Sequence, residues 1–167
     1  MSAPHYFDSP HFLSTALHVM TFLEIPVHIF GTYCILLTTP RSMRSIKWSM
    51  LNLHVWSAFL DLGISLLTTP FVLFPAIAGY PLGCLREVGV PTAAQIYLIV
   101  MLFATVGVAI VTIFENRFFL LFAEQSSWKS VRIPFLTVNY TLAFLFFIPP
   151  YLHIPDQTTA LEHTFKV

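Results

Sequence analysis

The sequence predicts an all-α membrane protein with four transmembrane helices, and two observations carry that prediction. Of the 167 residues, 56% are hydrophobic and only 10% are charged, whereas soluble domains carry about 25% charged residues. The chain also contains four apolar stretches, each reaching the roughly 20 helical residues needed to cross a bilayer core of ~30 Å. The polar surface that water requires is therefore missing, and we expect the lipid bilayer to surround most of the chain.

The four expected spans follow one another through short links, as in helices that run antiparallel to their neighbours. The spans cover residues 12–37, 48–78, 91–115 and 131–152, and we expect residues 1–167 to form one membrane domain. Several prolines interrupt these spans and predict kinks, because each removes a backbone hydrogen bond. They are Pro26 in the first span, Pro70 and Pro75 in the second, and Pro149 and Pro150 in the fourth.

The basic residues predict the orientation of the chain, because excess Lys and Arg stay on the cytoplasmic side. They gather in the first and third links. These residues are Arg41, Arg44 and Lys47 in the first link and Arg117, Lys129 and Arg132 in the third, against Arg86 in the middle link and Lys166 in the tail. We therefore expect both termini outside and the first and third links inside. Trp48 and Trp128 then lie where interfacial aromatic residues gather.

Composition argues against several classes of function. Eight Lys and Arg balance eight Asp and Glu, so no basic face for nucleic acid is expected. Two cysteines, Cys34 and Cys84, are too few for a disulfide framework or a zinc site. The seven histidines show no pair three or four residues apart and no HExxH motif. We expect no metal and no cofactor.

Polar residues recur along the spans at helical spacing. At about 100° per residue, the polar residues of the first span share an arc of about 120° and those of the second an arc of about 80°. The stripes are Ser14, His18, Thr21, Glu24, His28 and Thr32 on the first span, His54, Ser57, Asp61, Ser65 and Thr68 on the second, and a weaker line of Gln95, Thr105, Thr112 and Asn116 on the third. We expect the helices to pack with these stripes inward.

Three intramembrane residues are candidates for function: Glu24, His54 and Asp61. A charged residue at mid-membrane costs roughly 2.5–3.5 kcal/mol on insertion scales, so it normally faces a bundle interior or a wet cavity. The functional interpretation is an ion site, a ligand contact or a switch. The alternative is hydrogen bonding between helices, or a carboxyl that stays neutral in apolar surroundings. For His54 the packing role is favoured over a ligand role.

The triplet Glu115-Asn116-Arg117 follows a long apolar run at the expected cytoplasmic end of the third span. Such residues can form a local lock, in which Glu115 pairs with Arg117 until helix movement lets Arg117 reach an intracellular partner. The alternative is that charged residues simply begin where the helix leaves the lipid. Both interpretations stay open on position alone.

Many short blocks resemble one known family, the class H serpentine chemoreceptors of nematodes. The first two spans carry EIPVHIFGTYCILLTTPRSMRSIKWSMLNLHVWSAFLDLGISLLTTPFVLFPAIAGYPLG, and the third and fourth carry GVPTAAQIYLI, IFENRF and FFIPPYLHIPDQ. The resemblance covers roughly residues 12–157. It implies the N-terminal part of a seven-helix bundle of the G-protein-coupled receptor superfamily.

The resemblance also implies a role and partners. Such receptors reside in the plasma membrane of sensory neurons, bind small environmental chemicals and act through a heterotrimeric G protein. Glu115-Asn116-Arg117 is similar to the acidic-x-Arg element at the inner end of their third span, which favours the lock as a switch on the G-protein side. Ligand-contacting residues are not implied by it.

The chain departs from the family after the fourth span, where TTALEHTFKV stops following the pattern. Spans five to seven are not in this sequence, so we expect an incomplete receptor that does not signal alone and that can pair with full-length receptors. Retention in the endoplasmic reticulum is the alternative location. Cys84 is expected to be a free thiol that Cys34 cannot reach.

Two other classes of function fit the sequence less well. A self-sufficient four-span scaffold or accessory protein of the tetraspanin or claudin sort would carry cysteine-rich outer loops, which this chain does not have. A membrane enzyme would need convergent catalytic groups. His54 and Asp61 share a face, but no nucleophile motif or metal set joins them. We expect no catalytic residues.

Overall fold

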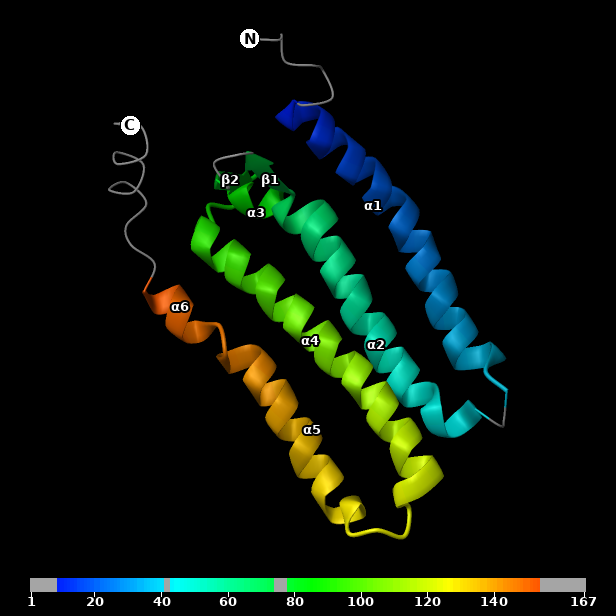
Figure 1. Cartoon of the computed structure of the whole chain (residues 1–167). Coiled ribbons are helices and arrows are strands. Elements are labelled where there is room, and N and C mark those ends of the chain that lie inside the picture. Colours follow the sequence, from blue (N-terminus) through cyan, green and yellow to red (C-terminus); the bar gives the residue numbers. More distant parts are fainter. Residues whose placement is uncertain (1–8, 41–42, 74–77, 154–167) are drawn as a thin grey trace.

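The computed structural model describes residues 9–40, 43–73 and 78–153, and they form a bundle of long helices with a small hairpin at one end (Figure 1). The elements are α1 (Pro10–Tyr33), η2 (Cys34–Thr38), α2 (Arg44–Leu62), η4 (Gly63–Thr68), β1 (Pro70–Leu73), β2 (Ala78–Pro81), α3 (Cys84–Glu87), α4 (Thr92–Phe118), η5 (Phe119–Ala123), α5 (Trp128–Leu145) and α6 (Ile148–Leu152). The labels η2, η4 and η5 mark π-helical turns that extend α1, α2 and α4.

Four helical segments are long and apolar enough to cross a membrane. They are Pro10–Thr38, Arg44–Thr68, Thr92–Ala123 and Trp128–Leu152. In Figure 1 they run side by side in chain order, each antiparallel to the one before. The expected four-span, all-α architecture is therefore confirmed.

Helix α4 lies in the middle of the bundle and carries most of its core. It packs most extensively on α2 and also contacts α5. Five of its buried residues recur at intervals of three, four or seven positions, which places them on one helical face. They are Gln95, Leu102, Thr105, Ala109 and Asn116, and Glu115 is also buried. The polar line that the sequence showed only weakly on this span thus includes three buried side chains, while Thr112 is half-buried.

The outer faces of the bundle are apolar. Large hydrophobic side chains such as Phe22, Phe114 and Phe122 are 70% or more exposed outside the bundle, an arrangement that water would penalise and lipid would not. Helix α1 has one buried residue, Thr21, and α5 has one, Ala143. The rest of the described bundle therefore covers little of the surface of these two helices.

The second span ends at Thr68, ten residues before the expected boundary at residue 78, so that boundary was wrong. Thr69 adopts a left-handed backbone with φ of 40°, and its N–H donates to Ile64 O at 3.0 Å. Pro70 follows without an N–H to continue a helix, and the chain enters β1 instead. Pro70 pairs with Pro81 in the antiparallel hairpin.

The hairpin returns directly against the end of the second span. The N–H of Gly83 donates to Thr68 O at 3.0 Å. A Cβ at Gly83 would lie only 2.3 Å from Leu67 O, so this close approach of two backbones requires glycine. The kink expected at Pro75 lies outside the described residues.

The third and fourth spans also differ from the expected limits. The third continues for eight residues beyond Glu115, to Ala123, because the apolar stretch after Arg117 can remain helical in lipid. The fourth begins at Trp128, three residues before residue 131, and is interrupted between Leu145 and Ile148. Pro149 lies in the first turn of α6, so the interruption expected near Pro149 and Pro150 is confirmed. The predicted outside position of the C-terminus concerns residues beyond those described.

Candidate functional site

Two polar clusters occupy the bundle, and the more enclosed one lies at the predicted inner end, where α4 and α5 are connected. We call it the inner-end junction and define it by Ser45, Glu115, Asn116, Phe119, Trp128 and Arg132. Glu115 and Asn116 are buried, with exposed fractions of 6% and 7%. Both belong to the predicted Glu115-Asn116-Arg117 triplet.

Both carboxylate oxygens of Glu115 are used by α5. Arg132 Nη2 donates to Glu115 Oε2 at 3.1 Å, and Trp128 Nε1 donates to Glu115 Oε1 at 3.0 Å. The Glu115 side chain is only 4% exposed, and a buried carboxylate is tolerated when it is paired and hydrogen-bonded in this way. The acid therefore ties the end of α4 to the start of α5.

Asn116 connects the same pair of helices to a third. Its Oδ1 accepts from Arg132 Nη2 at 2.9 Å, and its Nδ2 donates to the backbone oxygen of Ser45 at 3.1 Å. An amide can do both because it carries an acceptor and a donor on opposite sides. Through Asn116 the start of α2 joins the junction.

Arg132 is the shared centre of these contacts. Besides donating to Glu115 and Asn116, its guanidinium carbon lies 4.2 Å from the ring centre of Phe119, within the range of a cation–π interaction. Trp128 packs edge-on against Phe118, with ring centres 6.3 Å apart. A single guanidinium therefore holds two acceptors and an aromatic ring.

The expected pairing of Glu115 with Arg117 was wrong. Residues two apart on a helix are rotated by about 200° and do not face each other. Glu115 points into the junction, whereas Arg117 is exposed. The partner that sequence reasoning missed is Arg132, and the available signal was the spacing of Trp128 and Arg132. Four residues apart, these two lie on one face of α5.

The second cluster lies between α1 and α2, and we call it the α1–α2 seam. Its residues are Glu24, His28, His54, Asp61 and Ser65. The hydroxyl of Ser65 donates to Glu24 Oε2 at 3.0 Å, and His54 Nε2 lies 3.0 Å from the backbone oxygen of His28. His28 Nε2 lies 3.3 Å from Asp61 Oδ2. At these residues the predicted polar stripes of the first two spans face each other, and Glu24, His54 and Asp61 all belong to this contact. His18, also part of the first predicted stripe, is exposed.

The polar side chains of the seam are less completely paired and buried than those of the junction. The Asp61 side chain is 45% exposed. Although His28 approaches Asp61, neither of its ring nitrogens makes a hydrogen bond within the described part of the chain. The helices approach closely at Gly31, where an added Cβ would lie 2.7 Å from the His54 ring. The seam thus leaves polar groups available for another contact.

Neither cluster resembles a metal centre. Across the described ranges, no three His, Cys, Asp or Glu side chains gather closely enough to hold a metal ion. Cys34 and Cys84 are both free thiols in this structure. The chemistry that these clusters support is hydrogen bonding and ion pairing between helices.

Comparison with known proteins identifies the family. The family model described as serpentine type 7TM GPCR chemoreceptor Srh matches residues 8–167. A curated relative, serpentine receptor class H-72 of Caenorhabditis elegans, is 28% identical over 160 residues, which represent 92% of this chain and 45% of that protein. The chain thus spans a little under half the length of the relative. No solved structure matches it at a significant level. This chain is a multi-pass membrane protein that belongs to the Srh family of serpentine seven-transmembrane chemoreceptors.

Proposed function

We propose that this chain provides the first four helices of a plasma-membrane, G-protein-coupled chemosensory receptor for small environmental chemicals. The observation that carries this proposal is the inner-end junction, with its buried carboxylate and the exposed arginine beside it. Family membership supports the receptor class, and the Lys and Arg bias supports an orientation with the N-terminus outside. In that orientation the junction and Arg117 both face the cytoplasm.

The junction suits a two-state switch. Arg132 donates to both Glu115 and Asn116, so a movement of α5 relative to α4 would release two buried acceptors together. Such an all-or-none arrangement favours two discrete positions over a continuous range. Arg117 lies exposed on the same turn of α4, where it is available to a heterotrimeric G protein.

Coupling needs the rest of a seven-helix bundle. We propose that helices five to seven, in the same polypeptide or from a partner receptor, complete the ligand cavity and the G-protein surface. The four helices described in this structure would not signal alone. This part of the proposal follows from the family's seven-span design.

The coupling role is tested in a chimera of this chain with the C-terminal part of the class H-72 receptor that the match does not cover. The measurement is GTP exchange on a heterotrimeric G protein in isolated membranes. We expect exchange above the level of the unfused chain, and Arg117→Ala to lower that gain by about ten-fold, as for a central arginine in an interface. Lys129→Ala, which removes another exposed cation of the same end, should leave most of the gain.

Epitope tags on both termini provide the control for orientation and location. Tags on the unfused chain should label at the surface of intact cells, and a tag inserted between α4 and α5 should label only after permeabilisation. A C-terminal tag confined to the cytoplasm would contradict the orientation. Normal surface labelling with no exchange, or equal losses in the Arg117 and Lys129 variants, would contradict the coupling role.

A second candidate function has one observation in its favour. In the described structure, the Asp61 side chain is 45% exposed and lies within the second span, seven residues before its end at Thr68, where an uncovered carboxylate is costly. Contact with a second membrane protein would cover it. Pairing with full-length receptors through the α1–α2 seam is therefore the alternative role, in which this chain acts as an accessory protein.

A further inference from the structure

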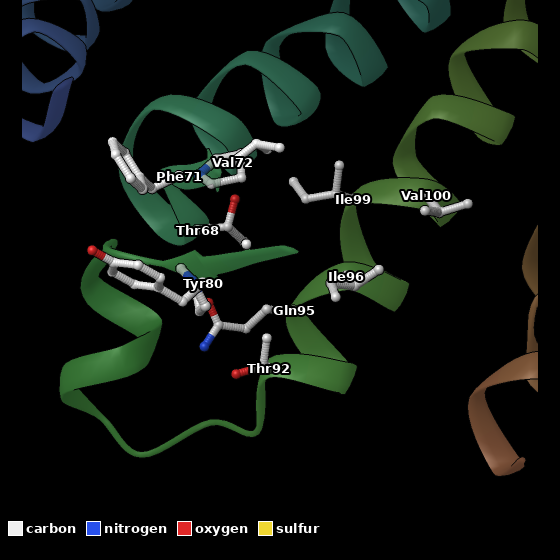
Figure 2. Close-up of a pocket in the computed structure, with 12 residues that line it drawn as sticks. Thr68, Phe71, Val72, Tyr80, Thr92, Gln95, Ile96, Ile99 and Val100 are labelled. Atoms are coloured by element: carbon white, nitrogen blue, oxygen red, sulfur yellow. The ribbon is translucent and has the colours of Figure 1, made fainter. Parts of the chain in front are cut away.

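A cavity of about 330 Å³ lies at the end of the bundle opposite the inner-end junction. It is formed between the β1–β2 hairpin and the first turns of α4 (Figure 2). Its walls are mainly apolar, with contributions from Phe71, Val72, Tyr80, Ile96, Ile99 and Val100. The predicted orientation makes this the outer end, which a chemical arriving from outside the cell reaches first.

Among the described residues, Gln95 is a buried polar residue of this lining with an unsatisfied side-chain atom. Its side chain is 2% exposed, and Nε2 donates to the backbone oxygen of Val90 at 2.9 Å. Its Oε1 accepts no hydrogen bond from the described residues. Because the nitrogen is held by that carbonyl, the oxygen must turn the other way. Figure 2 shows Gln95 reaching from α4 toward the hairpin, with its oxygen on the hairpin side.

Other features of the lining restrict what can bind. The buried Thr68 hydroxyl already donates to Gly63 O at 2.9 Å. No Lys, Arg, His, Asp or Glu lies among the lining residues of the described chain, so a charged ligand would find no counter-charge. The rings of Phe71 and Tyr80, 5.5 Å apart between centres, form an aromatic wall. The lining therefore favours a neutral and mostly apolar molecule.

The size of the cavity sets the size of that molecule. Small-molecule pockets occupy about 300–1,000 Å³, so this one is at the lower end. A cavity of ~150 Å³ accommodates benzene, so 330 Å³ accommodates a molecule of roughly twice that size. A buried acceptor gains from a ligand donor that satisfies it.

We infer that this cavity binds a small, neutral, largely apolar molecule whose hydroxyl or N–H donates to Gln95 Oε1. The inference rests on the proposed chemosensory function and deepens it, since it assigns a place and a chemical class to the ligand. Gln95 would select for the donor, while the aromatic and aliphatic walls would supply most of the binding.

The experiment compares two probes of similar shape on the 167-residue chain in lipid nanodiscs. 2-Naphthol carries a hydroxyl donor, and 2-methoxynaphthalene has none. Binding is measured by equilibrium dialysis against empty nanodiscs, which corrects for partition into lipid. We expect 2-naphthol to bind about five-fold more tightly, the effect of one hydrogen bond. Gln95→Met, similar in length but with no amide oxygen, should reduce this ratio to about one.

A second variant keeps the inference falsifiable if Gln95→Met folds poorly. Val100→Phe fills part of the cavity and leaves Gln95 in place, so it should weaken both probes by a similar factor. Any of three outcomes would overturn the inference: equal binding of the two probes to the unchanged chain, no binding of either probe, or a binding ratio that remains unchanged in Gln95→Met. Exchange on the G protein is measured separately in the chimera, so loss of coupling with an intact probe ratio would overturn the proposed function alone.

Discussion

The inner-end junction and the α1–α2 seam contain the same kinds of residues, but the polar groups of the junction are more completely buried and paired. At the junction, Arg132 and Trp128 satisfy both oxygens of a carboxylate that is 4% exposed. At the seam, Asp61 is 45% exposed and the imidazole nitrogens of His28 lack hydrogen bonds among the described residues. Sequence pattern placed Asp61 within its span and Glu115 at the end of its span, but it did not indicate which of the two acids would be fully paired.

The difference comes from how many helices meet at each place. Three helices converge at the junction, since Asn116 contacts the start of α2 and Arg132 on α5. The seam contacts of the described residues join two spans, the first and the second, and α1 has a single buried residue. A polar cluster can close only when donors and acceptors arrive from enough directions. The hydrogen-bonding groups of the junction are therefore satisfied within the bundle, whereas the exposed carboxylate of the seam is suited to contact another membrane segment.

Loss of Arg132 should lower the free energy of unfolding more than any other change considered below. A smaller effect would contradict the comparison between the junction and the seam. Arg132→Ala leaves Glu115 buried without its cation, and we expect it to lower the free energy of unfolding by about 3 kcal/mol. The measurement is unfolding by SDS in mixed micelles, followed by helical circular dichroism. Arg117→Ala, which removes an exposed cation from the same end, should change it by no more than about 0.5 kcal/mol. Equal effects of the two variants would show that the junction is not closed in the membrane.

Adding a methyl group at the closest point of the seam should have an intermediate effect. In Gly31→Ala the new Cβ would meet the His54 ring at 2.7 Å, and moving that ring breaks its contact with His28 O. We expect a loss of about 1–2 kcal/mol in the same unfolding assay. Gly107→Ala is the matched control because nothing lies within 4 Å of its Cβ position, and it should be neutral or slightly stabilising. If both glycines tolerate alanine equally, α1 and α2 do not meet there.

The smallest effect should be the coupling between His28 and Asp61. A double-mutant cycle of His28→Ala and Asp61→Asn should give about 0.6 kcal/mol, the average for polar contacts between membrane helices. The corresponding cycle of Glu115→Gln and Arg132→Ala should give a clearly larger value, since that pair is enclosed. Coupling of similar size in both cycles would mean that the seam is as closed as the junction.

Much of the fold was predictable because its signals are local. Hydrophobic length marked four spans, and the helical period placed Gln95, Thr105 and Asn116 on the face of α4 that the structure buries. The same period placed Glu24 and Asp61 on facing stripes. Local residue chemistry also indicated the break before α6, where Pro149 enters the first turn.

The end of the second span was not predictable from hydrophobicity, because the residues that follow Thr68 are as apolar as those before it. Only the backbone turn at Thr69 and the pairing of Pro70 with Pro81 separate helix from hairpin. The cavity beneath that hairpin, and the unsatisfied oxygen of Gln95 within it, depend on this turn and carry no sequence motif.

By itself, the sequence determined the membrane class, the number of spans, the inward stripes and the family resemblance, because each depends on composition or on spacing within one helix. Tertiary structure alone decided that Glu115 pairs with Arg132 and not with Arg117. Residues two apart on a helix are held on different faces, whereas residues 17 apart meet only when a connection returns one helix against another. Which acid finds a cation is therefore set by how the helices pack, and no local pattern contains that information.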